Sequence, residues 1–538
     1  MGTFSVPPPV QVLLAMSLVL IACCIEKLMR QRRSMRGLPG PPHHWLFGHI
    51  LVAGKMARDL PPDVHPHHYW QYLRKTYELG DIFYFDAWPL APPTVIICEA
   101  DMAEQITVKH SLDKHPIVKS YLKQHLGPEN MAAANGAAWK KARTVYNPGF
   151  APTHLMNVIS KIVQDVEVFH EVLSELSETG EVFSMESTAM KISFDVIGRL
   201  VLDMNLNSQR GSDELVDAFR KQLHFLDSST AWSSPFTGYN PFTQFAIWRN
   251  SRVIDKYVGR ILDQRFSSSA TANGKSKSEL SIMDVALDTY NAEQGVNTAP
   301  GSHRRMDATF RQSAIDQIRT FVFAGHDTIS TTISMIFYFL SKNPDARSKA
   351  GAELDSIFGP GMPAAAAQIR KDPHVLNRLP YCHAVIKETL RLFPPANTVR
   401  CGDGYHITDP TTGARYPTHD WIVWPDAFVI ARNEKYYPQA NRFIPERFLP
   451  ESPFPPIPVG AWRPFERGPR NCIGGEFGTL ELKVVMALTL RDFDFVPAYA
   501  KDAPTVDGEV CYQMLFGSAK PKSGVPGRVV CRLKTEEP

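Results

Sequence analysis

A single cysteine in a ten-residue loop near the C-terminus is the strongest constraint on how this chain folds. Residues 465–474 read FERGPRNCIG, and an amphipathic helical pattern follows from about 475 to 491. Gly468 and Pro469 predict a tight turn, so Cys472 should stand at the N-terminus of that helix. Free backbone N–H groups and the positive end of the helix dipole favour a thiolate over a thiol there. We therefore expect Cys472 to be an axial metal ligand rather than a buried hydrophobe.

The pattern F-x-x-G-x-R-x-C-x-G resembles the haem-binding loop of the cytochrome P450 family. The resemblance implies that Cys472 binds the iron of haem b (iron protoporphyrin IX), and that Phe465 covers the loop and limits water. Arg470 and Gly474 belong to the same expected cofactor site. A zinc site is the rival reading, but it needs several close Cys or His ligands, and none cluster around Cys472.

Three further residues resemble those that contact the haem carboxylates in this family. Trp139 and Arg143 lie one helical turn apart and match its WxxxR motif. An indole N–H and a guanidinium are suitable donors to carboxylates. Arg400, nine residues after Arg391, is a further candidate, although Arg470 is the surer one because it lies inside the ligand loop.

A long helix predicted over about 309–342 carries AGHDT at 324–328, which resembles the family's oxygen-activation motif. Gly325 would let dioxygen and substrate approach the backbone. Thr328 would hydrogen-bond bound oxygen or a water, and Asp327 would bring protons in from solvent. The alternative is a Thr that bonds back to its own helix and a solvated Asp. Together with Cys472, the motif favours catalysis.

Glu388 and Arg391 lie three residues apart on one helical face and match the family's ExxR element. Arg447, in PERF, resembles the third partner of that element. Their expected role is structural. The alternative is an ordinary surface ion pair, worth under about 1 kcal/mol, but the flanking apolar residues favour a packed position.

The resemblance covers nearly the whole chain of 538 residues. It implies a mainly α fold with a small β-rich subdomain, the cytochrome P450 fold, preceded by an N-terminal transmembrane anchor helix. Two short β-rich runs at 82–85 and 94–97 predict a hairpin. Between about 267 and 305 the polar composition predicts an irregular surface connection, interrupted by an apolar run at 281–287. Helical patterns cover roughly 155–175, 185–204, 212–226, 246–266, 309–342, 345–358, 379–392 and 475–491.

The N-terminus predicts a membrane anchor. An uncharged apolar run at 10–25 precedes five basic residues between 27 and 36. The positive-inside rule places the segment after the run in the cytosol, whereas a cleaved signal peptide carries its positive charge before the apolar core. We expect an anchor at 1–27, a basic and proline-rich joint at 28–65 and a haem-thiolate domain at 66–538, in a single-pass protein of the endoplasmic reticulum membrane.

The resemblance implies a monooxygenase that oxidises a lipophilic small molecule with dioxygen and electrons from an NADPH-dependent cytochrome P450 reductase, with cytochrome b5 as a second candidate donor. Runs at 281–284 and 512–517 look like members from filamentous-fungal secondary metabolism, so a secondary metabolite is the expected substrate class. A net charge of +3 is too small to suggest nucleic acid binding. Two alternatives stay open: a same-fold isomerase or dehydratase that acts on a peroxide without reductase, and a haem-binding sensor without turnover.

Surface and pocket expectations follow by the same analogy. Lys140, Lys141 and Arg467 form a candidate basic face for an acidic electron donor. The aromatic-rich segment 225–248 is a candidate for dipping into the bilayer, although plain packing is the commoner role of such a segment. The pocket lining is expected from 115–135, 205–250, Phe323 and Ala324, 396–399 and 514–516.

Overall fold

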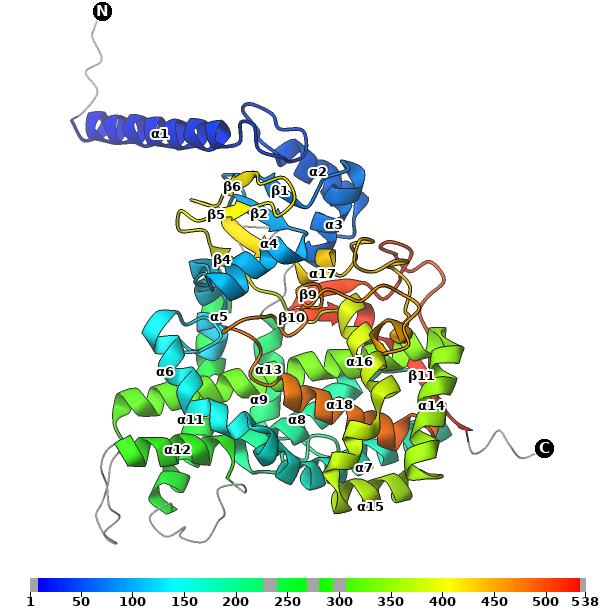
Figure 1. Cartoon of the computed structure of the whole chain (residues 1–538). Helices are drawn as coiled ribbons and strands as arrows, with labels where there is room; N and C mark the ends of the chain where they lie inside the picture. Colours follow the sequence, from blue (N-terminus) through cyan, green and yellow to red (C-terminus); the bar gives the residue numbers. More distant parts are fainter. Residues whose placement is uncertain (1–7, 226–239, 269–279, 294–305, 533–538) are drawn as a thin grey trace, which may run out of the picture.

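The computed structural model describes residues 8–225, 240–268, 280–293 and 306–532. They form a mainly helical body with a smaller β-rich part, as predicted, and one helix projects from the β-rich side (Figure 1). The helices of the body are α4 (Ala100–Glu104), α5 (Pro116–Leu126), α6 (Gly136–Tyr146), α7 (Pro152–Thr179), α8 (Met185–Leu202), α9 (Glu214–His224), α11 (Pro241–Ser268), α12 (Ile282–Glu293), α13 (Ala308–Lys342), α14 (Pro344–Phe358), α15 (Met362–Lys371), α16 (Pro380–Leu392), α17 (Ala427–Ile430) and α18 (Gly475–Thr489).

The projecting helix is α1 (Pro8–Ser34), whose apolar residues are exposed. Its stretch Gln11–Ser34 is long and apolar enough to cross a membrane. The helix continues past residue 27, where we expected the anchor to end, because the Leu, Met, Arg and Gln residues that follow are good helix formers. The expected joint also contains a helix of its own, α2 (Ile50–Asp59), which packs on α3 (Pro66–Thr76).

The β-rich part is built on a four-stranded sheet in the order β1-β2-β7-β4. The predicted hairpin is present, because β1 (Ile82–Phe85) pairs antiparallel with β2 (Thr94–Ile97) in the register Ile82↔Ile97. β7 (Ile422–Pro425) joins β2 in parallel, and β4 (Arg400–Cys401) completes the sheet. In this sheet β7 lies between β4, which carries Arg400, and a hairpin about 300 residues earlier in the chain.

The remaining strands form three small sheets. A three-stranded sheet has the order β3-β11-β8, and two hairpins, β5–β6 and β9–β10, stand alone. Their bounds are β3 Phe183–Ser184, β5 His406–Thr408, β6 Arg415–Pro417, β8 Phe493–Pro497, β9 Gln513–Phe516, β10 Ser518–Pro521 and β11 Pro526–Cys531.

Helix α13 runs through the middle of the helical body (Figure 1) and packs on α8, α16 and α18. Asp307 caps its N-terminus by accepting a hydrogen bond from the Phe310 N–H at 2.9 Å. Four of its ionisable residues, Asp316, Arg319, His326 and Asp327, are buried inside the protein. Arg319 Nη1 lies 2.7 Å from Asp255 Oδ1. This long helix therefore lies in the protein core.

One segment is more ordered than the sequence suggested. The apolar run inside the polar connection forms α12, whose buried side chains include Ile282 and Leu287. Ser281 and Asp284 form a reciprocal cap: the Ser281 N–H donates to Asp284 Oδ2 at 3.0 Å and the Asp284 N–H to Ser281 Oγ at 3.2 Å. This capping box satisfies the free N–H groups of the first turn, and its spacing was visible in the sequence.

Candidate active site

A cavity of about 300 Å³ lies between the central part of α13, the segment after α16 and the loop before α18. Its walls are mostly apolar, as expected of a site for a cofactor and a lipophilic substrate. Among the residues that border it are Cys472, Phe465, Arg470, Trp139, Arg143, Lys114, Ala324, Thr328, Ile329, Met131, Ala132 and the segment Pro395–Thr398. Residues separated by hundreds of positions in the sequence therefore meet around one space.

The cysteine loop is closed on itself by backbone hydrogen bonds. The Cys472 N–H donates to the Phe465 carbonyl at 2.8 Å, and the Asn471 N–H donates to that of Gly468 at 3.1 Å. Gly468 has φ +80°, and a Cβ there would stand 2.2 Å from the Thr107 carbonyl oxygen, so only glycine fits. Phe465 packs within 3.3 Å of the Cβ position of Gly475, at the start of α18. The turn predicted from Gly468 and Pro469 is present, and it fixes the sulfur.

Cys472 borders the cavity, and its side chain is exposed there. Burial raises the pKa of its thiol above the usual value, against the opposing effects of the Gly474 N–H, Arg143 and Lys114. The sequence led us to expect that the helix N-terminus would favour the thiolate. In the protein alone the loss of hydration is the larger effect, because the helix end supplies only a partial charge. A cation placed over the sulfur would therefore favour the thiolate form of Cys472.

A group of cationic side chains surrounds the other end of the loop. Arg143 donates to the Asn471 carbonyl at 2.8 Å and to its Oδ1 at 2.9 Å. Arg470 lies over the Trp139 ring, 4.6 Å from the centroid, and donates to the Ala134 carbonyl at 2.6 Å. Both guanidinium groups thus bond to neutral oxygens, and they keep their positive charge available for an anionic ligand.

Arg400 and Lys114 complete this group. Arg400 Nε and Nη2 are buried without a hydrogen-bond partner among the described residues, and Glu466 Oε2 is 3.8 Å from Nη2. Burial, followed by the nearby Arg400 and Arg470, lowers the pKa of Lys114 to about 7. Such a surplus of positive charge on buried and half-buried side chains is costly unless an anion joins it. These cationic side chains would therefore suit the two carboxylates of a haem, and the Cys472 sulfur in the same cavity would suit its iron.

Lys114 was missed by sequence reasoning, because no motif surrounds it and only the fold brings it to Arg470. Arg400 and Gly474, by contrast, were predicted but do not border the cavity. Arg400 lies behind the wall, in β4. Gly474 caps the first turn of α18, and the Cβ position there is 3.8 Å from Phe150.

The oxygen-activation motif is only partly as expected. Thr328 borders the cavity and its Oγ1 donates to the Ala324 carbonyl at 2.8 Å. Gly325 does not face the cavity: a Cβ there would stand 2.5 Å from Ile197 Cδ1 on α8. The expectation that Gly325 opens the backbone to dioxygen and substrate is therefore wrong in this structure. The glycine instead allows α13 and α8 to pack closely, and α13 stays a regular helix there.

Asp327 also points away from the cavity. It is fully buried, and its Oδ1 lies 2.8 Å from Nζ of Lys520 on β10, which also contacts Glu186 Oε1 at 2.7 Å. Neither Lys520 nor Glu186 could be found from the sequence, since no pattern links them to the motif. The neighbouring His326 stacks on Phe194 at 3.9 Å, and burial lowers its pKa to about 4, so its ring is neutral.

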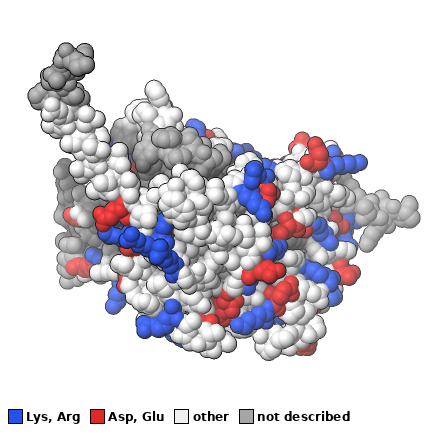
Figure 2. Space-filling model, turned by 90° about the horizontal axis from the view of Figure 1, so that it is seen from above, with Lys and Arg blue, Asp and Glu red and all other residues white. Residues whose placement is uncertain are grey.

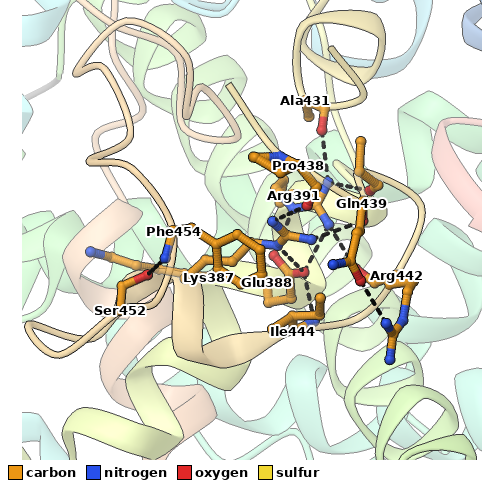
Figure 3. A network of polar contacts seen from close by, with 12 residues as sticks. Lys387, Glu388, Arg391, Ala431, Pro438, Gln439, Arg442, Ile444, Ser452 and Phe454 are labelled. Carbon is orange, nitrogen blue, oxygen red and sulfur yellow. Dashed lines mark hydrogen bonds and ion pairs between the residues drawn. The ribbon is translucent and has the colours of Figure 1, made fainter. Parts of the chain in front are cut away.

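Glu388, Arg391 and Arg447 are buried in the core, and Figure 3 shows Glu388 and Arg391 within a network of polar contacts. Arg391 makes two hydrogen bonds to Glu388, of 2.6 and 2.7 Å, and Arg447 Nε lies 3.3 Å from Glu388 Oε1. Arg391 Nη1 also donates to the carbonyls of Ala431 and Ala440, each at 2.7 Å. The triad thus ties α16 to the irregular segment 431–447, and the surface-pair alternative does not apply.

The expected lining is right for Ala324 and for parts of 115–135 and 396–399, but Phe323, 514–516 and the described part of 205–250 do not border the cavity. Side chains of Leu223, Phe323 and Asp327 all lie within 3.5 Å of the position that a Cβ on Gly517 would take, so packed side chains close that side. The expected aromatic residues between 226 and 239 lie outside the described residues. Phe242, Phe245 and Trp248 are exposed on α11.

Comparisons with known proteins agree with this geometry. A family model described as cytochrome P450 matches residues 38–522. The chain is 35% identical to the cytochrome P450 monooxygenase polC of Polytolypa hystricis, over 95% of this chain and 93% of the relative. It is 36% identical to the cytochrome P450 monooxygenase acrF of Aspergillus aculeatus, over 87% and 97%. It is also 23% identical to cytochrome P450 3A16 of Mus musculus, over 95% of each chain.

Proposed function

This chain belongs to the cytochrome P450 family of monooxygenases, and from that premise we propose that it holds haem b through Cys472 and oxidises a lipophilic small molecule. The observation that carries the proposal is the shared cavity: a cysteine sulfur, a surplus of cationic side chains and the Thr328 hydroxyl all border or flank one mostly apolar space. Haem, when bound, supplies the activation of dioxygen, for which protein side chains have no equivalent.

The roles of the residues follow from their positions. Cys472 would bind the iron, while Arg143, Arg470, Lys114 and the indole N–H of Trp139 would bind the haem carboxylates. Phe465 packs over the loop and would limit water near the sulfur. Thr328 would orient a water or dioxygen in the cavity and pass on a proton. Asp327 would be the source of that proton.

Electrons would come from an NADPH-dependent cytochrome P450 reductase, with cytochrome b5 as a second donor. The candidate basic face is weaker than its sequence suggests. Arg467 Nε lies 2.6 Å from Glu104 Oε1, and Lys141 Nζ is 3.9 Å from Glu293 Oε2. Partial neutralisation lowers the field that would steer an acidic partner, so Lys140 would contribute most of the attraction.

The membrane arrangement is proposed from α1 and the surface around its base. Figure 2 shows basic residues near the base of the projecting helix and a largely uncharged area beside them. Trp45, Phe47, Leu51 and Leu90 are exposed in this part of the chain. A single-pass anchor in the endoplasmic reticulum membrane, with the catalytic domain on the cytosolic side, would bury the apolar helix and leave the basic residues at the cytosolic surface.

The deciding experiment is expression of the full chain with a reductase in membranes, followed by spectroscopy and product analysis. The reduced protein with carbon monoxide should show the thiolate-type haem band. Incubation with a panel of lipophilic secondary metabolites should then yield oxidised products that require both NADPH and reductase. Product formation from an added peroxide without reductase would favour the isomerase alternative, and a haem spectrum without any product would favour the sensor.

A further inference from the structure

A buried group of three charged residues lies behind the cavity-lining face of α13. Lys520 Nζ stands 2.8 Å from Asp327 Oδ1 and 2.7 Å from Glu186 Oε1. The three side chains come from β10, α13 and α8. Their exposed fractions are 5% for Lys520, 0% for Asp327 and 13% for Glu186, so the group extends from the interior to an edge that water reaches at Glu186.

The hydrogen bonds fix Lys520 in place. Its Nζ donates to Glu186 Oε1 at 2.7 Å, to the Asp327 carbonyl at 2.9 Å and to Ser330 Oγ at 3.3 Å, while the Asp327 carboxylate contacts it as an ion pair. These acceptors use the three N–H bonds of an ammonium. Burial would lower the pKa of Lys520, but Asp327 and Glu186 oppose it and raise the pKa above the usual value. Lys520 is therefore a fixed cation shared by two acids.

We propose that Glu186 and Lys520 carry protons from solvent to Asp327, and that Lys520 holds the Asp327 carboxylate out of the cavity until it receives one. This proposal rests on the proposed function, because it supplies the protons that an oxygenase needs. Asp327 precedes Thr328, whose hydroxyl borders the cavity. The route therefore connects the surface at α8 with the oxygen side of the active site.

The transfer balances as a proton shift along three groups. Glu186 takes a proton from water, and this proton passes to Lys520 as Lys520 gives one of its own to Asp327. Glu186 returns to a carboxylate, Lys520 stays an ammonium and Asp327 becomes a carboxylic acid. A neutral Asp327 is no longer held by the charge of Lys520. Its side chain is then free to rotate towards the cavity, and it returns to Lys520 after it has lost the proton.

Other titratable groups near Asp327 do not compete for this role. They are Tyr121 on α5 and His326 on α13. Burial and then the charge of Asp327 raise the pKa of the Tyr121 hydroxyl, whereas burial lowers the pKa of His326 to about 4. Both groups are therefore neutral between pH 5.5 and 8, roughly the range in which the proposal is tested.

A triad with a purely structural role would also tie β10 to α13 and α8. The test therefore compares variants that remove a charge with variants that keep the charge but block proton transfer. Lys520→Arg keeps the cation, but a guanidinium does not release its proton. Glu186→Gln keeps the shape and the Lys520–Asp327 pair but removes the solvent-side acid. Lys520→Met removes the cation. Lys522→Met is the matched control, because Lys522 pairs with Asp63 just beyond β10 and has no contact with Asp327.

The first measurement uses the full-length holoenzyme without substrate. Reduced protein is mixed with dioxygen in H2O and in D2O, and the rate of haem reoxidation is followed by stopped flow. Lys520→Arg and Glu186→Gln should slow this proton-dependent reaction by at least about tenfold and change its solvent isotope effect, whereas Lys522→Met should not. A wild-type rate and isotope effect in Lys520→Arg, or in Glu186→Gln, would overturn the relay.

The second measurement does not depend on the haem reaction. Lys520→Met leaves two buried carboxylates without their cation, so its thermal midpoint should fall more at pH 8 than at pH 5.5, where protonation relieves the loss. Lys520→Met/Asp327→Asn should recover part of the fall, and Lys520→Arg should stay near wild type. An unchanged midpoint in Lys520→Met would overturn the holding role. If the wild-type protein lacks a haem-thiolate spectrum, the proposed function fails, while this measurement still reports on the triad.

Discussion

Arg32 Nη1 lies 2.5 Å from Asp86 Oδ2, and both side chains are buried. Arg32 is in the last turn of α1, whereas Asp86 directly follows β1. Arg32 also donates to the carbonyls of Leu46 and Trp88. The apolar helix is therefore fastened to the catalytic domain, and the proline-rich segment after it is not a free hinge.

Arg32→Ala should loosen this attachment and destabilise the β-rich part. Removing one partner of a buried ion pair leaves Asp86 with His43 at 3.2 Å and a hydrogen bond from the Trp88 N–H at 3.2 Å, and such a loss costs about 3–5 kcal/mol. Tryptic cleavage after Arg33 and Arg36 should become faster, and the thermal midpoint should fall. The control is Arg30→Ala, whose pair with Glu26 is exposed and which should change neither; equal cleavage rates in the two variants would contradict the attachment.

Cys472→Ser should abolish the thiolate band of the reduced carbon monoxide complex, because a serine hydroxyl does not replace a thiolate on haem iron. Cys531→Ser is the matched control, since Cys531 is a partly exposed cysteine at the end of β11 and its variant should keep the band. An unchanged spectrum in Cys472→Ser would mean that another residue binds the iron.

Thr328→Ala should release more hydrogen peroxide for each NADPH consumed, because the hydroxyl that borders the cavity no longer directs a proton. Peroxide and NADPH are measured together in the reconstituted system. Thr332 also borders the cavity, one turn further along α13, so Thr332→Ala controls for lost volume. Equal peroxide release in the wild type and Thr328→Ala would remove the role given to this hydroxyl.

Glu388→Gln should destabilise the protein by about 3–5 kcal/mol, since it leaves the buried Arg391 and Arg447 without their anion. Unfolding by denaturant in the presence of haem gives this value. Lys349→Ala removes an exposed partner of Glu446 and should have little effect. Similar losses of unfolding free energy in both variants would show that the buried ion pairs stabilise the protein no more than the exposed pair.

Glu481→Gln should stabilise the protein at neutral and higher pH. Burial, followed by nearby Asp165, raises the pKa of Glu481 well above its usual value, and its Oε1 has no hydrogen-bond partner among the described residues. A carboxyl with a raised folded-state pKa costs stability as pH rises above its unfolded-state pKa of about 4.5, with a slope of up to about 1.4 kcal/mol per pH unit.

The gain from Glu481→Gln should therefore be small near pH 4.5 and grow towards pH 8 in thermal unfolding. Glu476→Gln, at an exposed position of the same helix, should show no such growth. A gain that does not depend on pH would rule out ionisation of Glu481 as the cause.

Features that depend on neighbours in the sequence were predicted well. The turn at Gly468, the hairpin of β1 and β2, and the pairing of Glu388 with Arg391 each depend on residues close in the chain, where local geometry decides the contact. The capping box of Ser281 and Asp284 also depends on residues close in the chain. The helix that it begins was not predicted, because the polar composition of the surrounding segment favoured an irregular connection. Gly325 was misread because the sequence does not show which side of a helix another helix will approach.

The sequence by itself determined the family, the sulfur at position 472 and the helix that carries Asp327 and Thr328. Only the tertiary structure decided what surrounds them. Lys520 reaches Asp327 across 193 residues of sequence, and Lys114 reaches the cations of the cysteine loop in the same way. Such contacts arise when separate elements pack on one core, and the free energy of a buried charge depends on every element around it, which no single stretch of sequence records.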